Sequence, residues 1–455
     1  MSGYSAALAF QCSRLEGLST GVFRLEAQNA TSNLPAQSVI RVTLPSNTLC
    51  DLHSFAFHFD VATTSGAAAA EGCRLPNKIE TMLNRVSVSV GGVEVAAGCN
   101  FYNVLVHTKA VVEGNWADDA GMNHPKIQSA TNIIHNYVSN LALTTEEVTT
   151  AVGREAYYCV DRWYGFLGEC QPRVLDTSLV GDIVVTLFLE QPTLCLTMSD
   201  IVANAAGFIT SGAGLPAPNY VVNNVYFTVR AYNLADGNYD NMVAAQLAAD
   251  PRGLEMGFKQ YMSFRDLNTG SSRFSLSTQS LDKIMVAHHH NINPSGLTQH
   301  PVLVRGANEV NIPPTQQDIP GMGGVTNYIH PYMQFTIPPA ALGTAVEYQY
   351  QLNGATYPMY RMTKNDVYQV TRLCGDYRNM DYGLNQFEED YFVSAISLTL
   401  DAYDARSIQG LNTRGISLNG FYQIFNASSS TDITLFCEMT SSLFIDSGRQ
   451  ISVIT

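Results

Sequence analysis

The sequence predicts an all-β protein made of two tandem strand-rich halves, and three observations lead to this fold class. Alternating apolar and polar residues, rich in β-branched and aromatic types, dominate the readable stretches. Two segments place a turn dipeptide between two such runs. Several landmarks also occur twice in the same order along the chain. We therefore expect each half to be an antiparallel β-sandwich, repeated once.

The alternation is clearest in two segments, 225–232 and 393–400. In the first, Val225, Phe227 and Val229 share one face of a strand, and tyrosine, threonine and arginine occupy the other. In the second, Ile396 and Leu398 alternate with serine and threonine. Each segment is predicted to be a half-buried strand.

Two dipeptides, Gly91-Gly92 and Asn353-Gly354, are predicted to be structural hairpin turns. Each separates two alternating runs, and glycine and asparagine accept the positive φ angles that a two-residue hairpin turn requires. A short helix-like segment follows each hairpin, at 101–106 and at 364–370.

Further landmarks support an internal duplication. Three apolar positions of the first half recur at one constant spacing in the second; the pairs are Leu44 and Leu276, Leu49 and Leu281, and Leu52 and Ile284. Segment 182–189 resembles 393–400, and 225–229 resembles 433–437. Turn residues, a weakly helical stretch and a proline separate the halves.

These features predict four regions of the chain. They are an N-terminal arm over 1–19, a first half over 20–235, a linker over 236–250 and a second half over 251–455. Two long polar insertions, 113–155 and 291–336, are expected to project as loops from one end of the molecule.

The composition is that of a folded chain with unusually few charges. Hydrophobic residues make up 46% of the 455 residues, and 20 Phe with 23 Tyr exclude a disordered chain. Charged residues make up only 14%, against about 25% in an average soluble domain. This deficit predicts that much of the outer surface is buried against other chains.

Several classes of protein are disfavoured by the charges and by the ends of the chain. Acidic residues outnumber basic ones by 39 to 25, and the six lysines form no basic run, so direct nucleic-acid binding is not expected. The strongest apolar run, 183–189, is too short for a membrane-spanning helix, and the first residues lack the pattern of a signal peptide. Nine scattered cysteines without a Cys-x-x-Cys pair fit a reducing compartment, so we expect folding in the cytosol or nucleus.

Two motifs suggest chemistry, but the sequence around each favours a structural role. The stretch 17–21 matches the nucleophile-elbow pattern around Ser19, yet no buried strand precedes it, so we interpret it as an N-terminal turn. In His288-His289-His290, the first and third side chains share a strand face and could bind one metal ion. No third ligand can be placed, so we predict a structural or surface role with a weak response to pH.

Three further patterns are also interpreted without a site. Cys50 and His53 are three residues apart on a strand and therefore point to opposite faces. The acidic run 388–390 reads as a solvated turn, and the glycine-rich stretch 321–324 as a flexible loop without the strand and helix of a phosphate site. We thus expect no catalytic, metal or cofactor-binding residue and no enzymatic activity.

The ordered landmarks resemble one family of viral proteins. The residues that carry the resemblance are 84–95, followed by Phe-Tyr-Asn-Val-Leu at 101–105, together with 410–415 and 443–455. They are similar to the double jelly-roll major capsid proteins of eukaryotic DNA viruses of the polinton-like, virophage and amoebal kinds. The resemblance extends from about Ser38 to Thr455.

The resemblance implies a function and a set of partners. It implies two upright jelly rolls, over 20–235 and 251–455, in a subunit whose homotrimers form pseudo-hexameric capsomers of an icosahedral shell. The partners would be neighbouring capsomers and minor capsid, penton and cement proteins, and the location would be the virion capsid after synthesis in the host cytoplasm or nucleus. Three copies of two similar sandwiches supply six similar sides, which suits a hexagonal lattice.

Two alternatives remain open on the residues alone. One is a carbohydrate-binding or carbohydrate-cleaving β-sandwich, because aromatic-rich jelly rolls host such functions too. The other is a minor capsid or spike protein with a single jelly roll and an appendage. Two halves with one common topology would favour the major capsid protein over the second alternative.

Overall fold

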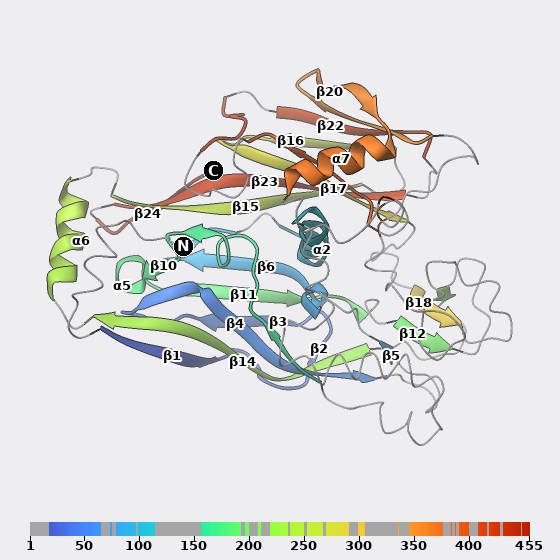
Figure 1. Cartoon of the computed structure of the whole chain (residues 1–455). Helices are drawn as coiled ribbons and strands as arrows, with labels where there is room; N and C mark the ends of the chain where they lie inside the picture. The colour runs from blue at the N-terminus through green and yellow to red at the C-terminus, as the bar shows by residue number, and fades with distance from the viewer. Residues whose placement is uncertain are drawn as a thin grey trace.

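Figure 1 shows the computed structural model of the chain. The structure describes residues 18–64, 73–74, 79–96, 99–113, 156–192, 196–199, 208–210, 219–234, 237–249, 253–266, 270–290, 299–304, 335, 345–375, 384, 387, 391–399, 408–415, 418–427, 431–446 and 448–455. Most strands of the first half occupy the lower part of the view and most strands of the second half the upper part, whereas β18 of the second half lies beside β12 and β5.

The first half forms two antiparallel sheets. The larger sheet has the order β1-β14-β4-β10, with β2 paired to β14 and β8 paired to β4. Its strands are β1 (Leu18–Glu26), β2 (Leu34–Pro35), β4 (Leu49–Thr64), β8 (Ala156–Val160), β10 (Val174–Asp176) and β14 (Asn219–Leu234). The smaller sheet has the order β3-β11-β6-β7, with β3 (Val39–Thr43), β6 (Leu83–Val90), β7 (Val93–Glu94) and β11 (Ile183–Leu189).

The second half repeats this arrangement. Its larger sheet has the order β21-β17-β23-β15-β9, with β24 paired to β23, and its smaller sheet the order β16-β22-β19-β20. The strands are β15 (Leu254–Asp266), β16 (Ser271–Leu276), β17 (Leu281–His290), β19 (Glu347–Leu352), β20 (Ala355–Met362), β21 (Val393–Ser397), β22 (Leu418–Phe425), β23 (Thr431–Ile445) and β24 (Ile451–Ile454). In the first half, β1 pairs with β14, and β14 pairs with β4. In the second half, β15 pairs in the same way with β23, and β23 pairs with β17.

Alternation in the sequence determines which side chains enter each core. Along β11, every second residue from Ile183 to Leu189 is buried. In the larger sheet of the same half, the ring of Phe227 stacks on Phe55 and Phe57 with centroids 5.4 and 5.1 Å apart. The buried aromatic rings add large apolar areas to the core of this sandwich, and burial of apolar area is the main driving force for folding.

Helices connect the strands at equivalent places. The helix α2 (Tyr102–Glu113) follows the β6–β7 hairpin, and α7 (Lys364–Cys374) follows the β19–β20 hairpin. The helix α7 begins at a capping box in which Thr363 and Asp366 satisfy each other's backbone amides. The shorter helices are η1 (Ile79–Met82) and α5 (Thr177–Val180). Between the halves lies α6 (Gly237–Ala249), at one side of the molecule in Figure 1.

Two sets of strands cross between the halves. The strand β9 (Cys170–Gln171) belongs to the first half in sequence but pairs with β15. A small fifth sheet, β13-β18-β12-β5, also combines segments of both halves; its members are β5 (Cys73–Arg74), β12 (Leu196–Ser199), β13 (Phe208–Thr210) and β18 (Gln299–Val304). Backbone hydrogen bonds therefore tie the two sandwiches together.

Two expectations from the sequence are wrong. Segments 182–189 and 393–400 are not equivalent, because β11 lies in the smaller sheet of its half and β21 lies in the larger one. The counterpart of β11 is β22, and the counterpart of β21 is β8. The strands β8, β11, β21 and β22 all contain alternating or continuous apolar residues. A similar apolar pattern is therefore not sufficient to identify which strands of the two halves are equivalent. The stretch around Ser19 is no turn either, since Leu18 already begins β1.

Candidate functional site

Both predicted turn dipeptides connect adjacent strands of the smaller sheets. Gly91 and Gly92 join β6 to β7 with φ angles of 55° and 84°. Asn353 and Gly354 join β19 to β20 with φ angles of 49° and 85°. These are the left-handed backbone conformations that the sequence pattern requires.

His288 is a core residue of the second sandwich. Its Nε2 lies 2.9 Å from the hydroxyl oxygen of Tyr422, and the rings of Tyr348 and Phe392 lie against it. Burial lowers the pKa of His288 to about 3. The next two histidines end β17, and the structure describes only their backbone. Among the described residues, no group of three or more His, Cys, Asp or Glu side chains is arranged to hold a metal ion.

The other motifs bring no chemistry together. Ser19 is exposed on β1, while Cys50 is buried and His53 is exposed on β4. The acidic run 388–390, the glycine-rich stretch 321–324 and most of the two long insertions lie outside the described residues. In the part of the chain that the structure describes, no helix is long and apolar enough to cross a membrane.

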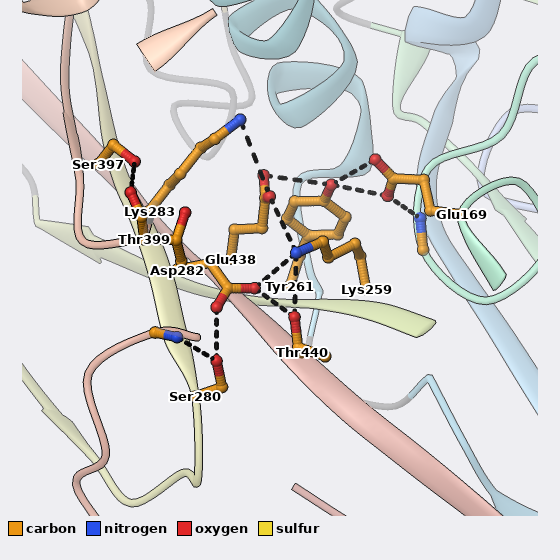
Figure 2. Close-up of polar contacts among 12 residues, drawn as sticks. Glu169, Lys259, Tyr261, Ser280, Asp282, Lys283, Ser397, Thr399, Glu438 and Thr440 are labelled. Carbon is orange, nitrogen blue, oxygen red and sulfur yellow. Dashed lines mark hydrogen bonds and ion pairs between the residues drawn. The ribbon is translucent and has the colours of Figure 1, made fainter. Parts of the chain in front are cut away.

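The feature that sequence reasoning missed is a group of charged side chains between the two halves, most of them fully buried. We call this group the charge cluster. Figure 2 shows its members from the second half together with Glu169. Its members are Lys109, Glu113 and Glu169 from the first half, and Lys259, Asp282, Lys283 and Glu438 from the second. All three lysines are at most 3% exposed.

Lys109, on α2, makes the contacts that join the halves. Its Nζ lies 2.7 Å from Glu113, 3.5 Å from Glu169 and 3.1 Å from Glu438 on β23. The two acids of the first half and the one acid of the second half thus share a single ammonium group. Buried ion pairs of this kind need several partners, because burial removes the hydration of each charge.

Two lysines of the second half also contact Glu438. Lys283 Nζ lies 3.9 Å and Lys259 Nζ 4.0 Å from the same Glu438 oxygen. Lys259 also donates to Asp282 at 2.7 Å and to the Thr440 hydroxyl at 2.9 Å. These three strands, β15, β23 and β17, are adjacent in one sheet, so their side chains meet on one face.

Tyr261 links the cluster back to the first half. Its hydroxyl lies 2.7 and 2.9 Å from the two carboxylate oxygens of Glu169, and 3.4 Å from Glu438. Glu169 in turn accepts a hydrogen bond from the Gly165 amide at 2.7 Å. Figure 2 shows these contacts as a continuous chain from the loop of Glu169 to β17.

The pKa values follow from burial and from the balance of charges. Burial alone lowers the pKa of Lys109, but the carboxylates of Glu113 and Glu438 outweigh it and raise that pKa well above its ordinary value. Burial alone raises the pKa of Glu438, but Lys109, Lys283 and Lys259 lower it to about 2. For Glu169, burial raises the pKa despite Lys109. Lys109 and Glu438 are therefore both ionised at neutral pH and bind each other across the two halves.

Apolar and polar contacts surround the charge cluster. Phe166 of the first half packs edge to face on Phe258 of β15, with ring centroids 5.2 Å apart. The Asn100 amide donates to the Ser263 hydroxyl at 3.0 Å. The guanidinium of Arg265 lies 4.9 Å from the centre of the Phe101 ring. The first half therefore covers the outer face of the larger sheet of the second half.

A weak signal of the cluster was present in the sequence. Lysine is rare in this chain, Lys283 directly precedes the apolar run 284–287, and Glu438 lies between the apolar run 435–437 and Met439. Charged residues at such positions indicate a covered polar face, but their partners lie far away in the sequence. Lys109 and Glu438, for example, are 329 residues apart.

Comparison with solved structures shows the same architecture in viral shells. One match is a chain of the PBCV-1 virus capsid, with a TM-score of 0.55 and 12% identity over 96% of this chain and 97% of that chain. Another is a chain of the Sputnik virophage structure, with a TM-score of 0.54 and 12% identity over 96% of this chain and 89% of that chain. Together with the repeated strand order, these matches decide the fold. This chain is a double jelly roll.

The double jelly roll is recognised through its structure alone. No known sequence-family profile matches the chain, and no curated protein matches it in sequence. At 12% identity the similarity establishes the fold and leaves the function to be argued from the chain itself. Within this double jelly roll, the charge cluster lies at the joint between the two jelly rolls.

Proposed function

We propose that this chain is a major capsid protein, three copies of which form a pseudo-hexameric capsomer of an icosahedral virus shell. The observation that carries the proposal is the duplicated strand order in a double jelly roll, similar over nearly its whole length to chains of the PBCV-1 capsid and the Sputnik virophage. Both of those structures are of virus particles.

The charge cluster supports this role because a shell subunit must keep its two jelly rolls in one fixed orientation. Three adjacent subunits present six sides only if the two halves of each subunit do not move relative to each other. Ion pairs from Lys109 to Glu438, together with the β9–β15 pairing, hold the halves together. A rigid joint of this kind serves assembly rather than turnover of a substrate.

The remaining parts of the proposal concern the partners and the place of action. The chain would act in the virion capsid after synthesis in the host cytoplasm or nucleus. It would contact neighbouring capsomers and minor capsid, penton and cement proteins, and would not bind the genome directly. The net charge of −14 supports this last point.

The test is the state of the purified full-length chain. Light scattering on a size-exclusion column should give the mass of three chains at micromolar concentration, and electron microscopy should show particles with a six-cornered outline. Raising the salt concentration should dissociate the trimer poorly, because screening acts on exposed charges and hardly on buried apolar area. A stable soluble monomer would refute the proposal and favour the carbohydrate-binding alternative.

A further inference from the structure

The two jelly rolls differ in the segment between the hairpin turn and the helix that follows it. In the sequence, Gly91-Gly92 and Tyr102 have the same spacing as Asn353-Gly354 and Lys364. The two segments can therefore be aligned residue by residue without a gap. Small residues at 96–98, Ala-Ala-Gly, correspond to Pro-Met-Tyr at 358–360.

In the first half, this segment forms part of the contact between the jelly rolls. The amide of Asn100 donates to Ser263, and Phe101 packs under Arg265. Both partners lie on β15, the first strand of the second jelly roll. The corresponding segment of the second jelly roll lies between the β19–β20 hairpin turn and α7.

In the second half, the segment is an exposed apolar protrusion. The register of β20 against β19 moves from Tyr357 opposite Tyr350 to Met362 opposite Tyr348, so the residues between them bulge out of the ladder. Met359 is 95% exposed, Tyr360 54% and Tyr357 45%. We call these three residues the β20 knob. Large apolar side chains grouped on a protein surface are typical of a binding site for another protein.

The counterpart of β15 in the first half is β1. Arg230 of β14 pairs with Asp51 and Val22, as Glu438 of β23 pairs with Lys283 and Tyr261. Val22 therefore takes the place of Tyr261, and Arg24 that of Ser263.

The two edge strands differ in what covers them. Tyr261 is only 3% exposed under the first half, whereas Val22 is 70% and Phe23 36% exposed. On its far edge, β15 is paired with β9. Among the described strands, β1 pairs only with β14, so its far edge has no such cover.

We propose that the β20 knob of one chain binds β1 of a second copy of this chain at Val22, on the strand face that also carries Arg24. This inference rests on the proposed function, because it names the contact that joins the subunits of the trimer. The contact joins, between chains, the segment and the strand that are equivalent to those joined inside one chain, where Asn100 and Phe101 contact β15. It therefore continues that interface around a ring. In Figure 1, β20 and β1 lie at opposite ends of the stacked sheets, as a head-to-tail contact requires.

The chemistry of the two surfaces is complementary. The knob offers a thioether and two phenol rings, and β1 offers the exposed aliphatic side chain of Val22 at an open edge. Arg24 lies over the ring of Tyr226 at 4.1 Å beside this edge, where the tyrosine hydroxyls of an incoming knob can hydrogen-bond. Aromatic residues and methionine are the types enriched at the centre of protein interfaces.

The experiment uses two single variants of the full chain, Met359→Glu and Val22→Glu, alone and mixed. Each substitution places a carboxylate in the proposed contact. Each variant alone should therefore need a protein concentration about tenfold higher, or more, than the wild type to form half of its trimer. Both residues are exposed, so the far-ultraviolet circular dichroism and the unfolding midpoint should match those of the wild type. Val39→Glu is the matched control, since Val39 on β3 is 40% exposed and lies outside both the knob and β1; it should remain trimeric.

The mixture tests the head-to-tail arrangement directly. The intact knob of the Val22→Glu chain can bind the intact β1 of the Met359→Glu chain, but no third chain can then close the ring. Light scattering should therefore show monomers in each solution alone and a one-to-one heterodimer in the mixture. Trimers of both variants as stable as the wild-type trimer would overturn this inference and leave the proposed function standing. A monomeric wild-type chain would instead refute the proposed function itself.

Discussion

The strands β14 and β23 occupy the same position in the two jelly rolls, yet they are buried differently. Along β14, Val225, Phe227 and Val229 are buried, while the residues between them are partly or fully exposed. Along β23, every residue from Ile433 to Leu443 is buried. The difference arises because α2 and the loop of Glu169 cover the outer face of β23, whereas no described element of the same chain covers Arg230 on the outer face of β14. Burial of a strand is thus decided by what packs on its sheet as well as by its own pattern.

The largest expected effect comes from removing the acid on the covered strand. Glu438→Ala leaves three buried lysines without their shared carboxylate, so the free energy of unfolding should fall by about 3–5 kcal/mol. Arg230→Ala changes the equivalent position on the open strand and should change stability by less than about 0.5 kcal/mol. Urea unfolding of both variants measures the difference. Equal losses would mean that the two faces are not distinguished by burial.

Acid should weaken the second jelly roll through His288. Its pKa is lowered to about 3 in the folded chain, against about 6.5 when unfolded. Protons therefore bind the unfolded state more tightly, and the contribution that is complete above pH 6.5 is lost as the pH falls toward 3. By pH 5 the loss should be about 2 kcal/mol.

The measurement is the unfolding free energy between pH 7 and 5 for wild type and His288→Gln. The variant should lose most of this pH dependence. His53→Gln is the control in the first jelly roll, where burial lowers the pKa of a partly exposed histidine. If the wild type and His288→Gln have parallel pH profiles, His288 does not titrate as described.

A double-mutant cycle compares a buried ion pair with an exposed one. Lys109→Met and Glu438→Gln should show a coupling of about 1–3 kcal/mol, because their charges meet away from water at the joint. The surface pair Arg361 and Glu347, 3.2 Å apart with side chains 52% and 35% exposed, should couple by about 0.2–1 kcal/mol. A coupling at the joint no larger than that at the surface would contradict the role assigned to Lys109.

The smallest effect is expected at the hairpin turns. Gly92→Val and Gly354→Val place a β-branched residue at φ angles of 84° and 85°, which should cost about 1 kcal/mol or slightly more each. A Cβ meets no atom within 4 Å at either position, so the cost comes from the backbone alone. Thermal unfolding measures it, and unchanged midpoints would contradict the positive φ angles.

Local features of the fold were predictable because they depend on neighbours in sequence. The turns at Gly91-Gly92 and Asn353-Gly354 follow from the φ angles those residues accept, and strands such as β14 follow from their alternation. The two helices after the hairpins were also predicted, although α2 extends to Glu113 and α7 to Cys374. The order of landmarks was sufficient to indicate two similar halves.

Alternation reports that a strand has two faces, but it does not say which element covers the outer one. For this reason the equivalence of 182–189 with 393–400 was wrong, and β9 could not be assigned to the sheet of the other half.

The sequence alone thus determined the strand-rich class, the duplication and the turns. Strands and turns depend on residues that are close together, and the duplication follows from the repeated order of these local patterns. Only the tertiary structure decided that half of the six lysines lie inside the molecule, and that Lys109 binds Glu438 at the joint. A charged residue in an apolar strand is stable only beside a partner of opposite charge, and that partner is brought close by packing of the two jelly rolls. Only the tertiary structure likewise showed that the β20 knob and the far edge of β1 are exposed, because exposure depends on which surfaces the rest of the chain covers.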